Sequence, residues 1–131
     1  MPREHLHGTP RQEARAFSPA VITRGGRQVW LSGVGECVDE DGNSMAGDFE
    51  AQTRATFRTI EKVLERAGGG MKDIVTMTVF ISESRHGDRF TEIRKEIFPA
   101  QYPASALISV SGFTRPEKLI EIQAVAVIGD E

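Results

Sequence analysis

Hydrophobic and polar positions along this chain repeat with two different periods, and the longer period marks a helix between residues 48 and 67. Apolar or small side chains recur there three and four positions apart, which is the spacing of one helix face. Asp48 is a suitable N-cap, and a glycine of Gly68-Gly69-Gly70 suits the left-handed C-cap position. The recurring residues are Thr56, Ile60, Val63, Leu64 and Ala67.

A second, shorter helix is predicted from about Asp88 to Phe98. Phe90, Ile93 and Ile97 share one face of it. Pro99 ends it, because a proline disfavours the helical conformation of the residue before it.

The segment Ile74–Ser82 is rich in β-branched residues and predicts a strand. Successive strand side chains point to opposite faces, and both faces of this strand carry apolar residues. One set is Val75, Met77, Val79 and Ile81, and the other is Ile74, Thr76, Thr78 and Phe80. Two helices cover only one face of a sheet, so the other face is expected to be covered by another subunit.

Four further strands complete the predicted fold. Two short runs, Ala20–Thr23 and Gln28–Ser32, flank Gly25-Gly26 and suggest a hairpin, with Trp30 as a core aromatic. Two more are predicted at Ala106–Ser111 and Leu119–Val127. The order β-β-α-β-α-β-β predicts a two-layer α+β domain with both helices on one face. Residues 1–16 are polar and aperiodic and are expected to form an arm or short edge strand, with a single domain over 17–131.

Composition argues against nucleic acid and membrane as partners. The 131 residues carry a net charge of -3, and a basic excess occurs only in the first thirty residues, where a solvated arm is expected. No run approaches the length of a signal peptide or a membrane span. The single cysteine, Cys37, excludes an intramolecular disulfide and fits a reducing compartment, so a cytoplasmic location is expected. Phosphate-loop, dinucleotide and paired-cysteine motifs are absent, and neither cofactor nor metal is expected.

Glu121 stands out because it lies inside the otherwise apolar run Ile120–Val127. Moving an ionised carboxylate out of water is costly, so a glutamate in such a place is either paired or used. Two interpretations stay open. Glu121 either activates water as a general base or is a structural carboxylate bonded to backbone N–H groups.

Several segments together resemble the RidA (YjgF) family in their order and spacing. They cover roughly residues 17–128 and are Phe17-Ser18-Pro19-Ala20-Val21, Leu31-Ser32-Gly33, Gln52-Thr53-Arg54, Val63-Leu64-Glu65-Arg66-Ala67-Gly68, Asp73-Ile74-Val75, Thr78-Val79-Phe80-Ile81, Phe98-Pro99, Tyr102-Pro103-Ala104 and Glu121-Ile122-Gln123-Ala124-Val125-Ala126. The resemblance implies a chorismate-mutase-like α+β fold and a homotrimer with a central barrel. Three pockets are then expected between subunits.

The resemblance also implies a chemistry. Active members hydrolyse reactive enamines and imines without a metal or cofactor. An arginine directly after Pro-Ala grips the substrate carboxylate, a glutamate on the last strand positions water, and a Ser-Gly pair shapes the pocket. In this sequence Glu121 matches the glutamate, and the pair is Ser32 and Gly33. Thr91 stands where many members have an asparagine, Ala20 where some have a tyrosine, and Leu107 is expected to contact substrate.

Ser105 departs from the family pattern, because it occupies the position of the substrate-binding arginine. A charge-assisted hydrogen bond contributes about 1.5–3 kcal/mol, against about 0.5–1.5 kcal/mol for a neutral one. Either another cation replaces the arginine or the ligand is different. Arg24, Arg94 and Arg115 are the candidate replacements, and each is expected to be a surface residue.

Three functions therefore stay open. The first is a cofactor-free deaminase or hydrolase acting on an imine, enamine or related small unsaturated nitrogen compound, with Glu121 activating water. The second is a trimeric small-molecule-binding protein that has lost the chemistry. The third is a ribonuclease, which the acidic balance disfavours.

Overall fold

A four-stranded mixed sheet forms the centre of the fold in the computed structural model, which describes residues 3–129. Its strands lie in the order β3 (Arg27–Trp30), β6 (Ile120–Ile128), β4 (Ile74–Ile81) and β5 (Ala104–Ser109). The long strand β6 runs antiparallel to both β3 and β4, whereas β4 and β5 run parallel. A parallel pair needs a crossover between its strands, and the second long helix supplies it.

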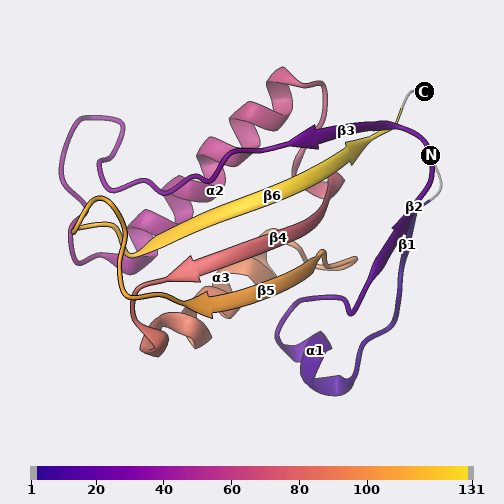
Figure 1. Cartoon of the computed structure of the whole chain (residues 1–131), viewed down its shortest axis with the longest axis horizontal. Coiled ribbons are helices and arrows are strands. Elements are labelled where there is room, and N and C mark those ends of the chain that lie inside the picture. Colours follow the sequence, from indigo (N-terminus) through magenta and orange to yellow (C-terminus); the bar gives the residue numbers. More distant parts are fainter. Residues whose placement is uncertain (1–2, 130–131) are drawn as a thin grey trace.

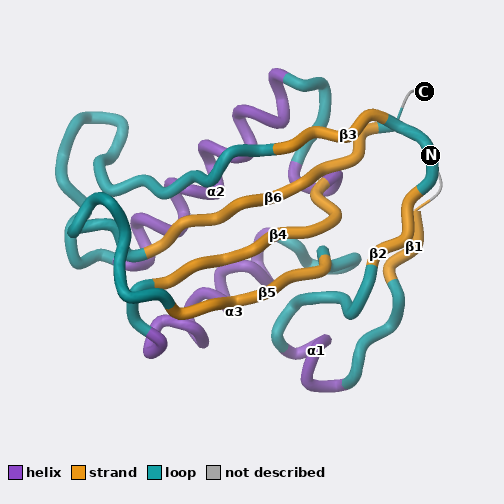
Figure 2. Tube along the Cα trace, viewed as in Figure 1, coloured by secondary structure: helices purple, strands orange, loops and turns teal. Residues whose placement is uncertain are grey.

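Two helices, α2 (Phe49–Arg66) and α3 (Gly87–Ile97), cover one face of this sheet. Both lie behind the strands in Figure 1, and the tube view in Figure 2 shows no described segment in front of them. The predicted two-layer arrangement, with both helices on one face, is confirmed. One sheet face therefore remains open within residues 3–129. None of the described helices combines the length and the hydropathy that a membrane span requires.

The ends of α2 follow the predicted signals. The Asp48 side chain accepts a hydrogen bond from the Ala51 N–H at 3.0 Å, which satisfies one of the first four donors of the helix. At the other end Gly68 has a φ of 90°, a conformation that glycine adopts without strain. The Gly69 N–H then bonds to the Leu64 carbonyl at 2.9 Å and closes the last turn.

Strand β4 corrects one prediction. The register shifts between Ile74 and Thr76, as in a β-bulge, so that Ile74 joins the helix-facing side and the predicted alternation is wrong at its start. From Met77 onward the alternation holds. Met77, Val79 and Ile81 are buried beneath the helices, while Thr78 and Phe80 are partly exposed on the open face.

The predicted hairpin around Gly25-Gly26 is wrong. Strand β2 (Val21–Thr23) pairs instead with β1 (Arg3–His5), and the two form a separate small sheet beside the main one (Figure 1). Both glycines have positive φ and turn the chain, but β3 continues along β6, whose nine residues offer a longer edge. A short helix, α1 (Pro10–Ala14), lies between β1 and β2 and is too short for a periodic signal.

Arg3 shows that the amino-terminal arm is anchored, so the expectation of a solvated arm is wrong for this residue. Its guanidinium donates to the Lys72 carbonyl at 2.7 Å and to the Val127 carbonyl, beside the end of β6. Asp73 lies 3.8 Å away and supplies a carboxylate partner.

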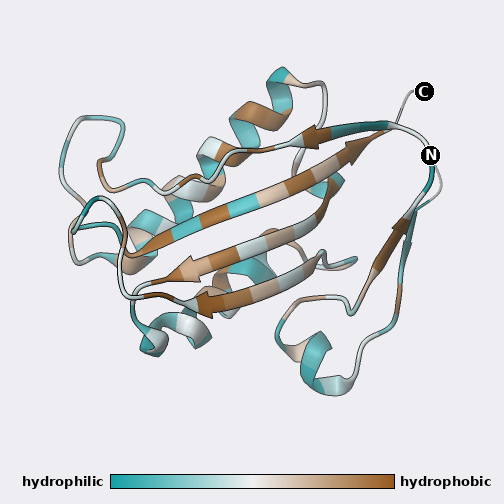
Figure 3. Ribbon diagram, viewed as in Figure 1, coloured by the Kyte–Doolittle hydropathy of each residue, from teal (hydrophilic) through white to brown (hydrophobic). Residues whose placement is uncertain are grey.

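The core lies between the sheet and the two helices. Figure 3 shows hydrophobic and polar residues alternating in the first half of β6, where the apolar residues Ile120, Ile122 and Ala124 are at most 2% exposed. Trp30 does not join this core. It is 73% exposed on the open face, so its prediction as a core aromatic is wrong within one chain. Cys37 is buried and unbridged, as expected of a single thiol.

Gln52 ties α2 to the segment that leads into β6. This side chain is fully buried and makes three hydrogen bonds. Its amide nitrogen donates to the carbonyls of Met45 and Glu117 at 3.0 and 2.9 Å, and its oxygen accepts from the Leu119 N–H at 2.8 Å. The amide thus satisfies backbone groups of two loops that would otherwise be buried without partners.

Replacing Gln52 by leucine should destabilise the protein by about 2 to 4 kcal/mol, because three backbone groups lose their partners while the volume stays similar. Urea denaturation would measure the change. The matched control is Gln28→Leu on the exposed strand β3, which should shift stability by less than about 0.5 kcal/mol. Equal effects of the two changes would contradict the role given to Gln52.

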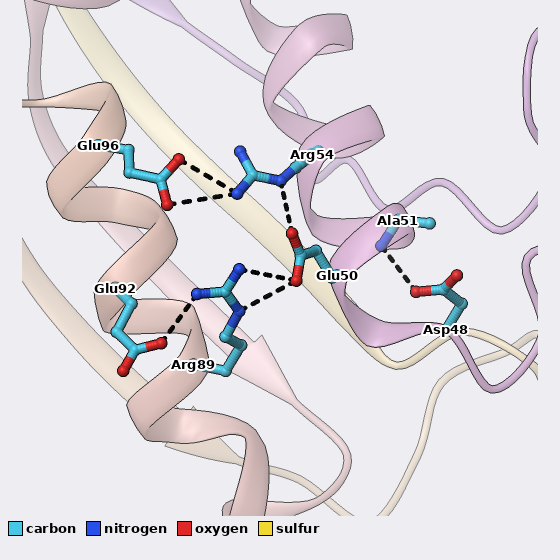
Figure 4. A network of polar contacts seen from close by, with 7 residues as sticks. All are labelled: Asp48, Glu50, Ala51, Arg54, Arg89, Glu92 and Glu96. Carbon is cyan, nitrogen blue, oxygen red and sulfur yellow. Dashed lines mark hydrogen bonds and ion pairs between the residues drawn. The ribbon is translucent and has the colours of Figure 1, made fainter.

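The outer faces of α2 and α3 are joined by an ion-pair network (Figure 4). Glu50 accepts hydrogen bonds from Arg89 at 2.7 Å and from Arg54 at 3.0 Å. Arg54 also reaches Glu96, and Arg89 reaches Glu92. The bonds from Arg89 and then Arg54 hold the pKa of Glu50 below its ordinary value of 4.5.

A lowered pKa in the folded state means that the ionised Glu50 favours folding above its unfolded pKa. That contribution disappears as the pH falls from 4.5 through the lowered folded value. Glu50→Gln should therefore lower the thermal midpoint slightly at pH 7, and the gap should close in acid and in high salt. Glu61→Gln, on an exposed part of the same helix, is the control. A gap that persists at pH 3 would refute this account.

Candidate functional site

The residues singled out in the sequence form two clusters on opposite faces of the sheet. Residues paired across neighbouring strands share a face. Ser105 pairs with Met77, which lies beneath the helices, whereas Glu121 pairs with Phe80 on the open face. Within one chain the two side chains are therefore separated by the sheet itself.

The first cluster surrounds Glu121 on the open face. The stretch 31–34 runs along β6, where Leu31 and Val34 donate hydrogen bonds to the carbonyls of Ala124 and Ile122. This places Gly33 directly against the glutamate. A Cβ on Gly33 would lie 2.6 Å from Glu121 Oε2, closer than side chains approach one another. The structure thus brings Gly33 next to Glu121, and Ser32 precedes Gly33 in the chain.

Lys118 is the member of this cluster that sequence reasoning missed. Its Nζ lies 3.2 Å from Glu121 Oε1, and its side chain is only 13% exposed. The other oxygen, Oε2, accepts no hydrogen bond from any described residue. Lys118 precedes Glu121 by three residues. Where a strand begins, however, a spacing of three does not predict that two side chains meet.

The second cluster lies between α3 and β5, on the helix side of the sheet. Ser105 Oγ accepts a hydrogen bond from Arg94 Nη1 at 2.6 Å. Leu107 lies two residues further along the same face and approaches Gly87, whose carbonyl accepts a hydrogen bond from the Thr91 hydroxyl at 3.1 Å. Thr91, Ser105 and Leu107, predicted as substrate-binding residues, thus line one region.

Arg94 corrects the expectation that the candidate arginines are surface residues. Its residue exposure is only 2%, and its guanidinium carbon lies 4.9 Å from the centre of the Phe90 ring and 6.0 Å from that of Phe17. Arg94 follows Phe90 by four residues, so it lies on the apolar face of α3. The spacing from Phe90 indicates this position in the sequence, but a charged side chain is ordinarily expected at the surface.

The electrostatic environment of Arg94 is unusual. Burial, and then repulsion from Arg15, lower the pKa of its guanidinium to about 10. It remains protonated at neutral pH, and no carboxylate within residues 3–129 forms an ion pair with it. The other two candidates are surface residues as expected, since Arg24 is exposed and Arg115 pairs with Glu117 with 61% of its side chain exposed.

These clusters differ in chemistry. One offers a partly exposed carboxylate beside a glycine backbone, which suits handling of a proton or a water molecule. The other offers a hydroxyl backed by a cation, which suits binding of an electron-rich group. Neither cluster holds both functions.

Replacing Gly33 by alanine should displace the Glu121 carboxylate without unfolding the protein. The clash is with the end of a flexible side chain, so the cost in stability should stay below about 1 kcal/mol. A crystal structure of the variant would show whether the carboxylate has turned away. Gly70→Ala is the control, because its added methyl would enter open space. An unmoved Glu121 in Gly33→Ala would disprove the packing described above.

Comparison with known proteins places this arrangement in a family. The family model described as Endoribonuclease L-PSP matches residues 9–128. The chain is similar to the Rid-family protein YyfB from Yersinia pestis, described as of unknown function, with 24% identity over 98% of this chain and 100% of the other and a TM-score of 0.86, which shows a shared fold.

Two other solved structures agree. A member of the YjgF/YER057c/UK114 family from Mycobacterium tuberculosis is 26% identical over 97% of this chain and 100% of its own, with a TM-score of 0.68. RidA from an Antarctic Psychrobacter is 25% identical over 86% and 88% of the two chains, with a TM-score of 0.71. Because the match to the family model spans nearly the whole domain, this chain belongs to the Endoribonuclease L-PSP family, the RidA (YjgF) family that its sequence resembles.

Proposed function

We propose that this protein hydrolyses an imine, enamine or related small unsaturated nitrogen metabolite without a cofactor, at a pocket formed between copies of the chain. The observation that carries the proposal is Glu121. Its carboxylate stands on the open sheet face, with one oxygen bonded to Lys118 and the other accepting no hydrogen bond from the described residues. A carboxylate oxygen in that condition is suited to take a proton from water.

A second copy is part of the proposal because the two clusters cannot meet within one chain. Ser105 faces the helices and Glu121 faces away from them. The open face also exposes Trp30 by 73% and Ile108 by 41%, which is apolar surface of the kind that subunit contacts bury. The family resemblance favours a homotrimer, in which the open faces line a central barrel.

In the proposed reaction Glu121 Oε2 accepts a proton from water while the water oxygen attacks the carbon of the C=N bond. The new C–O bond forms as the π electrons move to nitrogen. Proton transfer to nitrogen and loss of ammonia then leave a carbonyl product, so that one water is consumed for each ammonia released. An enamine enters the same route after tautomerising to the imine.

The remaining predicted residues have supporting roles in this scheme. Ser32 and Gly33 bring backbone close to the carboxylate and keep a side chain from filling the space beside it. Thr91, Ser105 and Leu107 would form the wall contributed by the other copy. The proposed steps use water and the Glu121 carboxylate and involve no metal or organic cofactor.

A non-catalytic small-molecule-binding protein is the second candidate, and the Lys118–Glu121 pair favours it. The ion pair at 3.2 Å gives this carboxylate a partner within the chain, as expected of a structural carboxylate. The ribonuclease suggested by the family description is disfavoured by the net charge of -3, because RNA binding depends on basic surface.

Glu121→Gln should lower the rate of imine hydrolysis by about two to four orders of magnitude while leaving the fold intact, since glutamine keeps the shape but accepts no proton. The assay generates 2-iminopropionate with an amino-acid oxidase and follows its clearance with semicarbazide as trap. Glu65→Gln, an exposed position on α2, is the control and should retain native activity.

The two candidate functions give different results in this assay. Native protein that fails to accelerate clearance of several imines, yet is stabilised against heat by small ligands, would favour the binding protein. Native and Glu121→Gln proteins with equal rates would refute the role of Glu121. Degradation of RNA by the purified native protein would support the ribonuclease instead.

A further inference from the structure

We propose that Arg94 and Ser105 together form a receptor for a small carboxylate ligand, with the cation supplied by helix α3 and a hydroxyl supplied by strand β5. The proposal rests on the proposed function for the location of the pocket, and it adds the charge and shape of the ligand. It is argued from the charge, the hydrogen bonds and the burial of these two side chains.

The charge of Arg94 is not balanced within the described chain. Several described arginines at the surface have carboxylate partners, such as Arg15 with Asp88 at 3.1 Å and Arg89 with Glu50 at 2.7 Å. Those pairs are at the surface, where an unpaired charge would cost little. Arg94 is 2% exposed and has no such partner in residues 3–129. A buried cation without a counter-ion is unfavourable, and a bound anion would remove that cost.

Arg94 also has N–H groups that form no hydrogen bond with the described residues. A guanidinium carries five N–H groups. In this structure Nη1 donates to Ser105 Oγ at 2.6 Å and Nη2 donates to the Arg15 carbonyl at 3.1 Å. The Nε atom is buried and has no hydrogen-bond partner among the described residues. Buried donors nearly always have a hydrogen-bond acceptor. The free N–H of this side chain is therefore expected to bond to an acceptor outside the described chain.

Ser105 extends the donor set toward the partly exposed side of the cluster. Because its oxygen accepts from Arg94, its own proton must point elsewhere. Among the described residues Ser105 donates to the Ala106 carbonyl at 3.5 Å, which is the limit of a hydrogen bond. The hydroxyl proton is therefore available to a ligand.

The two donors stand side by side. Arg94 Nη1 and Ser105 Oγ are 2.6 Å apart, a separation close to that of the two oxygens of one carboxylate. Such an anion could accept from the guanidinium through one oxygen and from the hydroxyl through the other, in the manner of a bidentate pair. A neutral amide offers only one acceptor oxygen and no charge, so it should bind poorly.

The surroundings hold the guanidinium in place for this role. Phe90 lies at 4.9 Å from it and Phe17 at 6.0 Å, and the Arg15 carbonyl fixes its far end. The acids of the same helix do not compete, because Glu92 pairs with Arg89, Glu96 pairs with Arg54, and Asp88 pairs with Arg15 and is 91% exposed. A serine at position 105 also avoids placing a second guanidinium beside Arg94, where like charges would repel.

The test is calorimetric titration of the native protein with propionate, in a buffer of low chloride, beside propionamide as the neutral analogue of the same shape. Propionate should bind and propionamide should bind at least about tenfold more weakly. Arg94→Lys keeps the charge but loses the planar fork, and it should weaken propionate binding about tenfold. Ser105→Ala should weaken it by a smaller factor.

Arg89→Lys is the matched control, since Arg89 lies on the same helix but in exposed ion pairs. It should leave propionate binding unchanged. If Arg94→Lys fails to fold, the side-chain Nε–H resonance of Arg94 in the native protein provides the readout. That resonance should shift on addition of propionate and stay in place on addition of propionamide.

The proposal is overturned if native protein binds neither compound, if it binds both equally, or if Arg94→Lys binds propionate as the native protein does. These outcomes are separate from the test of hydrolysis. Glu121→Gln should still bind propionate, so binding without turnover would remove only the proposed reaction. Turnover of imines by a native protein that does not bind propionate would remove only the carboxylate receptor.

Discussion

The alternation of side chains across the central sheet is the constraint on which the rest of the structure depends. Because β4, β5 and β6 are in fixed register, residues paired across them share a face, and a shift of one residue would reverse every assignment. That register directs Ser105 toward the helices and Glu121 toward the open face. The separation of the two chemically distinct clusters follows from it, and so does the requirement for a second copy in the proposed site.

The helix layer then determines the character of the Ser105 cluster. Helix α3 presents Phe90, Ile93 and Arg94 to the sheet, so a cation is buried together with apolar side chains. On the open face the strand neighbours are mixed, and Glu121 is accompanied by Lys118 and the backbone of Gly33. Each cluster is thus supplied by elements that the fold already needs for stability, and Gln52 fixes the segment that carries Lys118.

Much of the fold was predictable because its signals are local. The cap at Asp48, the glycines that follow α2 and the β-branched run of β4 each specify a structure from neighbouring residues alone. The predictions that are wrong concern distant partners. The pairing of β2 with β1, and the exposure of Trp30, depend on which edge or surface is available after folding. The grouping of Ser32, Gly33 and Glu121 followed from family resemblance rather than from physical pattern. The burial of Arg94 was not expected because charged residues are ordinarily exposed.

The central claim is that the functional site is completed by a second copy of the chain. A crystal structure of the assembled protein tests it most directly, through the distance from Glu121 of one copy to Ser105 of its neighbour. The account predicts that the two side chains face one cavity across the contact, with Trp30 covered by the assembly. A protein that is monomeric in solution and in the crystal, or an assembly that leaves the open sheet face in solvent, would contradict it.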